Sequence, residues 1–125
     1  MPVQMTTLYS DSRDFLNRRV LVRIDRPLGS KHPQHGFVYP VNYGFVPGTA
    51  APDGEPLDAY VLGICDPVAE FQGRCIAVIH RTNDADDKLI VVSDASDYSD
   101  EQIRASTDFV EKNFESVIIR QLAAS

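Results

Sequence analysis

Proline and glycine are concentrated in the middle of this chain, and they decide what that part of it can fold into. Proline removes a backbone donor from a helix, and glycine is a poor helix former. No helix is therefore expected between residues 40 and 56, and short extended segments joined by turns are predicted instead. The breaking residues are Pro40, Gly44, Pro47, Gly48, Pro52, Gly54 and Pro56.

Strict alternation of apolar and polar residues begins at Arg19 and predicts a half-buried strand that stops at Pro27. Its apolar side carries Val20, Val22 and Ile24. Further strands are predicted over residues 57–65, 74–80 and 88–93, joined by turns at Asp66-Pro67, Gln72-Gly73 and residues 83–87.

One convincing helix is predicted near the end of the chain. Ser99 and Gln102 form a capping box, and Ile103, Val110, Phe114 and Val117 recur at helical spacing. A short helix over residues 10–17 is a weaker expectation. The predicted fold class is mainly β with α (α+β), a small closed or nearly closed β-barrel with a helix packed against it.

Length and composition describe one domain over residues 1–125, with 1–18 as an extension and 117–125 as a tail. The chain is 43% apolar, and its longest nearly apolar run, residues 59–65, is too short to cross a bilayer. We expect no membrane partner and, because no basic-then-apolar leader precedes the domain, a cytoplasmic location. Cys65 and Cys75 are expected to be buried thiols.

The net charge of −6 is unevenly distributed along the chain. Residues 1–40 have an excess of basic side chains, whereas residues 41–101 are strongly acidic. This balance argues against nucleic acid as a partner, since binding its phosphates needs a clustered basic face. It suits divalent cations bound beside an anion, although acidic residues also collect in solvated loops.

Three carboxylates fall within six residues at Asp53, Glu55 and Asp58, where Gly54 and Pro56 prevent a helix. If they converge, a cation must offset their repulsion, and oxygen-only ligands favour Mg²⁺, Mn²⁺ or Ca²⁺. Asp86 and Lys88 stand two apart, which places them on one face of a strand. Taken singly, each acidic group is more often a solvated turn.

Two segments carry a resemblance to a known family. Residues 39–46 (Tyr-Pro-Val-Asn-Tyr-Gly-Phe-Val) and 53–62 (Asp-Gly-Glu-Pro-Leu-Asp-Ala-Tyr-Val-Leu) resemble the signature of the soluble family I inorganic pyrophosphatases, and a weaker match spans roughly residues 20–116. The resemblance implies an OB-like five-stranded barrel with flanking helices. It also implies a homo-oligomer that hydrolyses pyrophosphate to two phosphates with Mg²⁺, or with Mn²⁺ in its place.

The same resemblance assigns roles to individual residues. It implies metal ligation by Asp53, Asp58, Asp86 and Asp25, with Asp58 bridging two ions, and by Asp84 in place of an aspartate that aligns with Asn83. It implies that Glu55 assists the attacking water and that Asp58, Lys88 and Tyr43 complete the catalytic set. Phosphate or substrate binding is implied for Tyr39, Tyr43 and Lys88, with Lys31 standing in for absent cations.

Departures from the family pattern affect the phosphate-binding groups. Pro33 and His35 align where a lysine and a glutamate of a longer hairpin stand, and Asn113-Phe114 aligns with a tyrosine-lysine pair, with Lys112 one position away. Each lost cationic contact removes about 1.5–3 kcal/mol of charge-assisted hydrogen bonding. Two alternatives therefore stay open: the metal site acts on another phosphate-containing substrate, or the domain binds metal and phosphate without catalysis.

Overall fold

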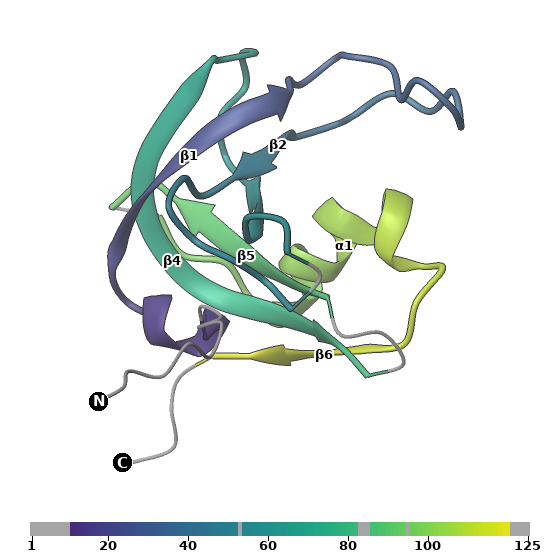
Figure 1. Ribbon diagram of the computed structural model, residues 1–125. Coiled ribbons are helices and arrows are strands. Elements are labelled where there is room, and N and C mark those ends of the chain that lie inside the picture. Colours follow the sequence, from purple (N-terminus) through teal and green to yellow (C-terminus); the bar gives the residue numbers. More distant parts are fainter. Residues whose placement is uncertain (1–10, 53, 83–85, 95, 121–125) are drawn as a thin grey trace.

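The computed structural model describes residues 11–52, 54–82, 86–94 and 96–120. These residues form strands, a short 3-10 helix (η1) and one α-helix, arranged as Figure 1 shows. The elements are η1 (Ser12–Phe15), β1 (Arg19–Arg26), β2 (Asn42–Phe45), β3 (Asp58–Val61), β4 (Glu70–Arg81), β5 (Asp87–Val92), α1 (Asp100–Glu111) and β6 (Ser116–Ile119).

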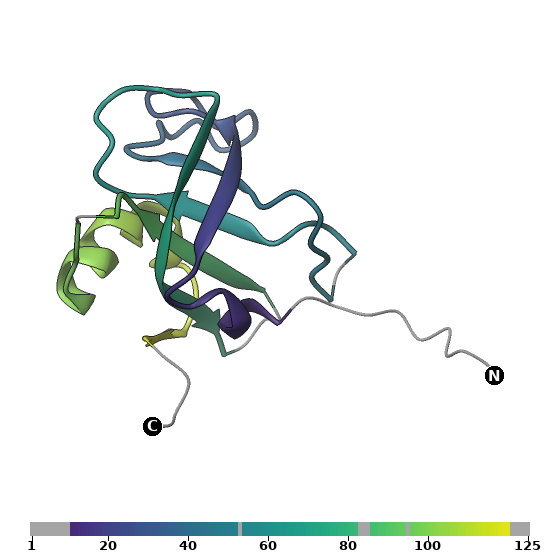
Figure 2. The same ribbon diagram turned by 90° about the vertical axis from the view of Figure 1, so that its left-hand side faces the viewer.

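Five of the strands close into a barrel. The hydrogen-bonded order is β1-β2-β3-β5-β4, and β4 pairs again with β1 to complete the circle. The β3–β5 pair is parallel, whereas the other pairs are antiparallel. Figure 2 shows β1 and β4 running side by side, with α1 on one flank of the barrel. The predicted fold class, mainly β with some α around an OB-like barrel, is confirmed.

Alternation along the strands produces two apolar layers. Leu89 and Val91 of β5 pack with the β1 residues Val20 and Val22 in one cluster, inside the barrel. Ile90 belongs to a second cluster, which includes residues of α1 and therefore lies between the barrel wall and the helix. Because side chains alternate along a strand, Lys88 faces the α1 side together with Ile90.

The capping box predicted for the helix is present. Ser99 Oγ accepts a hydrogen bond from the Gln102 amide, and Gln102 Oε1 accepts one from the Ser99 amide. The helix ends at Glu111, however, so the prediction that Phe114 and Val117 continue it is wrong. Val117 instead pairs with His80, because β4 offers its free edge to β6. Helical spacing over so few apolar residues did not distinguish this edge strand from a further helical turn.

The turn predicted at Gln72-Gly73 is also wrong, since β4 runs through both residues. Gly73 pairs with Val20, and a Cβ on Gly73 would lie 2.3 Å from the carbonyl oxygen of Val92. The glycine is required there by the close approach of another backbone and not by a turn.

The two cysteines differ in environment. Cys75 is buried as predicted, whereas Cys65 is exposed, so the expectation of two buried thiols is wrong for Cys65. Cys65 lies in the connection that follows β3 and not in the barrel wall, where continued alternation would have buried it. Burial raises the pKa of the Cys75 thiol to about 11.

This difference predicts selective alkylation. Iodoacetamide at neutral pH should modify one cysteine of the native protein, because the thiolate is the nucleophile and Cys75 is both buried and protonated. Mass spectrometry of peptides should find the label on Cys65, and Cys65→Ser should abolish native labelling. Cys75 should react only after unfolding in guanidinium, and its modification in the native protein at a comparable rate would contradict the described packing.

Within the described residues, no helix is long and apolar enough to span a membrane.

Candidate functional site

Strand register brings the central polar residues together on the outer face of the barrel. Asp58 of β3 lies directly beside Lys88 of β5 in the parallel pair, and Tyr43 of β2 lies opposite Tyr60 of β3. These residues all face the side that α1 covers. Residues that stand far apart in the sequence therefore meet at one place.

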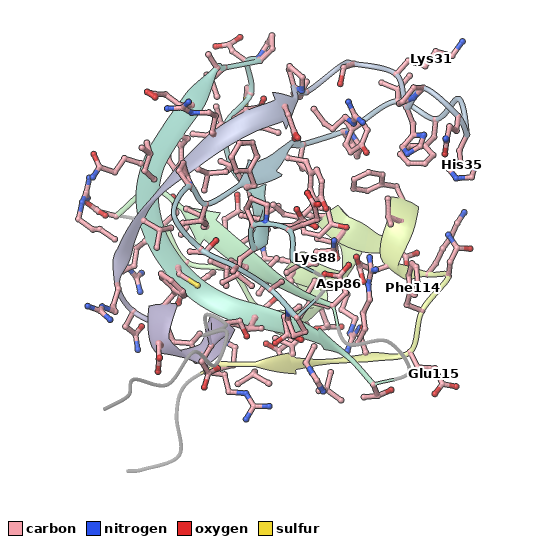
Figure 3. All side chains as sticks on the ribbon, in the orientation of Figure 1. Lys31, His35, Asp86, Lys88, Phe114 and Glu115 are labelled. Atoms are coloured by element: carbon pink, nitrogen blue, oxygen red, sulfur yellow. The ribbon has the colours of Figure 1, made fainter. Side chains whose placement is uncertain are left out.

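Lys88 is the centre of this group. Its Nζ lies 2.6 Å from Asp58 Oδ2, 3.1 Å from Asp86 Oδ2 and 2.9 Å from the Tyr43 hydroxyl. The Lys88 side chain is only 6% exposed, whereas Asp58 and Asp86 are partly exposed. The predicted placement of Asp86 and Lys88 on one face is thus realised, and Figure 3 shows them adjacent in the middle of the molecule.

The tyrosines of the site remain protonated hydrogen-bond donors. Burial raises the pKa of Tyr43 well above its usual value, and the charge of Asp58 raises it further. Burial also raises the pKa values of Tyr39 and Tyr60. At physiological pH their hydroxyl groups therefore add no negative charge near the carboxylates.

Arg81, which the sequence analysis missed, supplies a second buried cation. Its guanidinium donates to Glu111 through Nε (3.0 Å) and Nη2 (2.6 Å), and its Nη1 lies 3.3 Å from Asp86 Oδ2. Tyr60 donates its hydroxyl to Glu111 at 2.7 Å. Burial lowers the pKa of Arg81, but hydrogen bonding and charge from Glu111 and then Asp86 outweigh this, so the pKa is raised.

The sequence did contain a signal for this ion pair. Glu111 follows Ile103 and Thr107 at intervals of four, and all three are buried on one stripe of α1. Arg81 follows the buried Ile79 by two in β4, so it faces the same layer. Phe114, which aligns with a family lysine, places its ring 3.6 Å from the guanidinium carbon of Arg81.

A cavity of about 700 Å³ opens beside Lys88 and Arg81. Residues of the loop between β1 and β2 form one wall, and residues of α1 and of the segment after it form another. Lys112 and Asn113 are exposed residues of that second wall. Among the described residues, the lining consists of His32, His35, Phe37, Tyr39, Tyr43, Tyr60, Arg81, Lys88, Phe109, Val110, Lys112, Asn113 and Phe114.

Other predicted site residues lie outside this group. Asp53, Asn83 and Asp84 fall outside the described residues. Glu55 is exposed on the segment before β3 and, like Asp58 and Asp86, is not among the residues that line the cavity. Lys31 is exposed at the top of the β1–β2 loop and points away from Lys88 in Figure 3. The structure thus brings Tyr39, Tyr43, Asp58, Asp86 and Lys88 together, whereas Lys31 lies apart from them.

Asp25 lies at the edge of the site, near the end of β1. The pKa of Asp25 is raised above its usual value, mainly by burial. The charge of Asp58 adds to the rise, and the neighbouring Arg26 opposes it. In the described part of the chain, no group of three or more His, Cys, Asp or Glu side chains is placed to hold a metal ion. The carboxylates of Asp58 and Asp86 nevertheless converge on one point, since both contact Lys88 Nζ.

Comparison with known proteins gives consistent results. The model of the inorganic pyrophosphatase family matches residues 16–121. A relative named inorganic pyrophosphatase from Pseudomonas aeruginosa is 45% identical over 58 residues, which are 43% of this chain and 33% of the relative. One from Corynebacterium glutamicum is 35% identical over 86 residues, or 65% of this chain and 54% of the relative. The chain therefore spans about a third to a half of these relatives' lengths.

Solved structures share the fold. An inorganic pyrophosphatase from Ehrlichia chaffeensis has a TM-score of 0.62 at 21% identity, covering 90% of this chain and 89% of the other. One from Helicobacter pylori has a TM-score of 0.58 at 21% identity, covering 94% and 88%. Because the family model spans most of the residues from η1 to β6, and the barrel is the one these structures share, the chain belongs to the inorganic pyrophosphatase family.

Proposed function

We propose that this protein hydrolyses the phosphoric anhydride bond of inorganic pyrophosphate. The observation that carries the proposal is the placement of Lys88 between Asp58 and Asp86 at a cavity that Arg81 also lines. Lys88 and Arg81 are already paired with Asp58, Asp86 and Glu111, so a strongly anionic substrate would bind them together with a cation held by the partly exposed carboxylates. The names of the relatives in the same family support this choice of substrate.

In the proposed reaction, the oxygen of water forms a bond to one phosphorus atom while the bond from that phosphorus to the bridging oxygen breaks. The bridging oxygen leaves with the second phosphate, so pyrophosphate and water give two phosphates. Lys88 and Arg81 stabilise negative charge that develops on the phosphate oxygens, where preorganised donors have their largest effect. Tyr43 and Tyr39 donate hydrogen bonds, and Glu55 is the proposed acceptor for the proton of the attacking water.

Mg²⁺ is the proposed cofactor, with Mn²⁺ as an alternative. Asp58 and Asp86 offer carboxylate oxygens, which hard divalent cations prefer, and Mg²⁺ is often held by one or two carboxylates together with substrate phosphates. Asp53, Asp25 and Asp84 are proposed as further ligands. When bound, the metal lowers the pKa of water and neutralises phosphate charge.

The decisive test is phosphate release from pyrophosphate by the purified full chain. We expect release in the presence of Mg²⁺ or Mn²⁺ and its loss on addition of a chelator. The assay should be repeated with Zn²⁺ and at several pH values. No release under any of these conditions would refute the proposal, and saturable pyrophosphate binding without turnover would favour the non-catalytic alternative.

The homo-oligomeric state remains a proposal that rests on the family resemblance, and the cytoplasmic location remains a proposal that rests on the sequence pattern. Light scattering at several protein concentrations would establish the oligomeric state.

A further inference from the structure

Much of the cavity wall is unsuited to an inorganic anion. Phe37 and Phe109 have no polar side-chain atoms, and the faces of aromatic rings carry partial negative charge. Both residues are only partly buried, so their rings border the open space. Pyrophosphate is small compared with a cavity of about 700 Å³, a volume in the range of sites for organic ligands. The cavity therefore has room and apolar surface for a ligand with an organic part.

The aromatic wall is a group of mutually contacting rings. The ring centroid of Phe37 lies 5.3 Å from that of Tyr39 and 5.7 Å from that of Phe109. Tyr39 and Phe109 are 5.5 Å apart and meet edge to face. His32 adds a further ring at 4.8 Å from Phe37. Tyr39 is buried by these contacts, whereas Phe37 and Phe109 are partly exposed and keep ring surface open to the cavity.

The aromatic wall adjoins Lys88 and Arg81, whose charges are paired with Asp58, Asp86 and Glu111. The Tyr39 ring lies 5.8 Å from that of Tyr43, whose hydroxyl accepts a hydrogen bond from Lys88 Nζ. On the helix side, the ring centroids of Phe109 and Tyr60 are 6.0 Å apart. The Tyr60 hydroxyl donates a hydrogen bond to Glu111, which also pairs with Arg81. A ligand with a charged end on Lys88 and Arg81 thus has aromatic surface within its own length.

The loop between β1 and β2 adds polar groups beside these rings. His32 Nδ1 accepts hydrogen bonds from the amides of Gln34 (3.0 Å) and His35 (3.1 Å). Since Nδ1 is an acceptor, the proton of the neutral ring is assigned to Nε2, which makes that atom a donor. In Figure 3, His35 stands at the tip of this loop, above Phe114. Directional polar groups beside an aromatic wall are what a heterocyclic base requires.

We propose that this cavity takes a nucleoside 5′-diphosphate, with the diphosphate on Lys88 and Arg81 and the base against Phe37, Tyr39 and Phe109. The inference rests on the proposed function, because the same site would cleave the anhydride bond. Water oxygen bonds to the terminal phosphorus, the bond from that phosphorus to the bridging oxygen breaks, and the bridging oxygen stays on the nucleotide. The products are a nucleoside monophosphate and phosphate, and one proton is released to solvent near neutral pH.

Binding can be measured apart from turnover with two ligands that are not hydrolysed. Isothermal titration calorimetry in Mg²⁺ buffer should compare α,β-methylene-ADP with methylenediphosphonate, which lacks the nucleoside. Because a base stacked on aromatic side chains adds substantially to affinity, we expect the nucleotide analogue to bind about tenfold tighter or more. In saturation-transfer difference NMR, saturating protein protons should reduce the signals of the adenine protons of the bound analogue.

Substitutions test whether the aromatic wall causes the tighter binding of the nucleotide analogue. Phe37→Leu and Phe109→Leu keep apolar volume but remove the ring, and each should lower the affinity for α,β-methylene-ADP about fivefold more than the affinity for methylenediphosphonate. Phe71→Leu is the matched control, since Phe71 packs against the interior cluster of the barrel. If the rings serve only to hold the loop against α1, the wall variants will lower thermal stability without changing the ratio of the two affinities.

Failure of this inference is distinguishable from failure of the proposed function. Equal affinities of the two analogues for the wild-type protein, with pyrophosphate turnover intact, would overturn the inference alone. The absence of AMP on incubation with ADP, with pyrophosphate turnover intact, would also overturn it. Tighter binding of the nucleotide analogue by a protein that turns over neither substrate would instead overturn the proposed hydrolysis and leave the assignment of the wall standing.

Discussion

Asp58→Asn is expected to lower kcat/KM for pyrophosphate about 100- to 1,000-fold, the range typical for loss of a group that organises charge in an active site. The amide keeps the shape of the side chain but carries no charge. It therefore loses the ion pair with Lys88 Nζ at 2.6 Å and is a weaker ligand for a hard cation. The Mg²⁺ concentration that gives half-maximal activity should rise as well.

The control for this variant is Asp94→Asn, which makes the same chemical change at a surface position. Asp94 pairs with Arg19, and both side chains are more than half exposed. Exposed pairs contribute little, so activity should change by less than about twofold. Steady-state kinetics across a Mg²⁺ titration compares the two variants directly. An Asp58→Asn protein as active as the control would remove Asp58 from the proposed mechanism.

Arg81→Met is expected to lower the free energy of unfolding by about 3–5 kcal/mol, the cost of leaving a buried charge without its partner. The Arg81 and Glu111 side chains are 6% and 4% exposed, so solvent cannot replace the lost guanidinium. Glu111 would keep the Tyr60 hydroxyl as a hydrogen-bond donor at 2.7 Å, but it would lose the opposite charge. For a domain of this size, the melting temperature should fall by roughly 10–20 °C.

Two further variants identify the cause of this loss. Arg19→Met removes a surface cation that pairs with Asp94, and it should cost less than about 1 kcal/mol. Arg81→Met combined with Glu111→Leu removes both charges and should recover part of the stability, because apolar pairs often replace buried ion pairs without loss. Urea unfolding gives all three values. Equal stability of Arg81→Met and Arg19→Met would show that the buried pair does not stabilise the fold.

The strands of the barrel were largely predictable because their pattern is local. Val20, Val22 and Ile24 alternate without interruption, and the structure buries all three in β1. The capping box at Ser99 and Gln102 is also local, and it marked the start of α1 correctly. The role of Gly73 was not predictable from its neighbours, because glycine serves turns and close backbone approaches equally well. Only the position of Val92 decides between these two roles.

The candidate site likewise contains residues that the local sequence predicts and residues that only contacts between remote segments reveal. The spacing of Asp86 and Lys88 predicted a shared face, and the structure shows both in contact. Arg81 was missed because its significance depends on Glu111, which is 30 residues away and joins it only when α1 packs on the barrel. Phe37 and Phe109 were not considered as binding residues, because nothing near either of them in the sequence indicates that the β1–β2 loop faces α1.

The sequence by itself determined the family, the barrel class and the absence of a helix among the described residues of the segment 40–56, because prolines, glycines and alternation act over a few bonds. The tertiary structure alone decided which groups share the cavity. Strand register set Asp58 beside Lys88, and the packing of α1 brought Glu111 to Arg81 and Phe109 to Phe37. These contacts depend on distances between segments remote in sequence, which only the closed barrel and its covering helix fix.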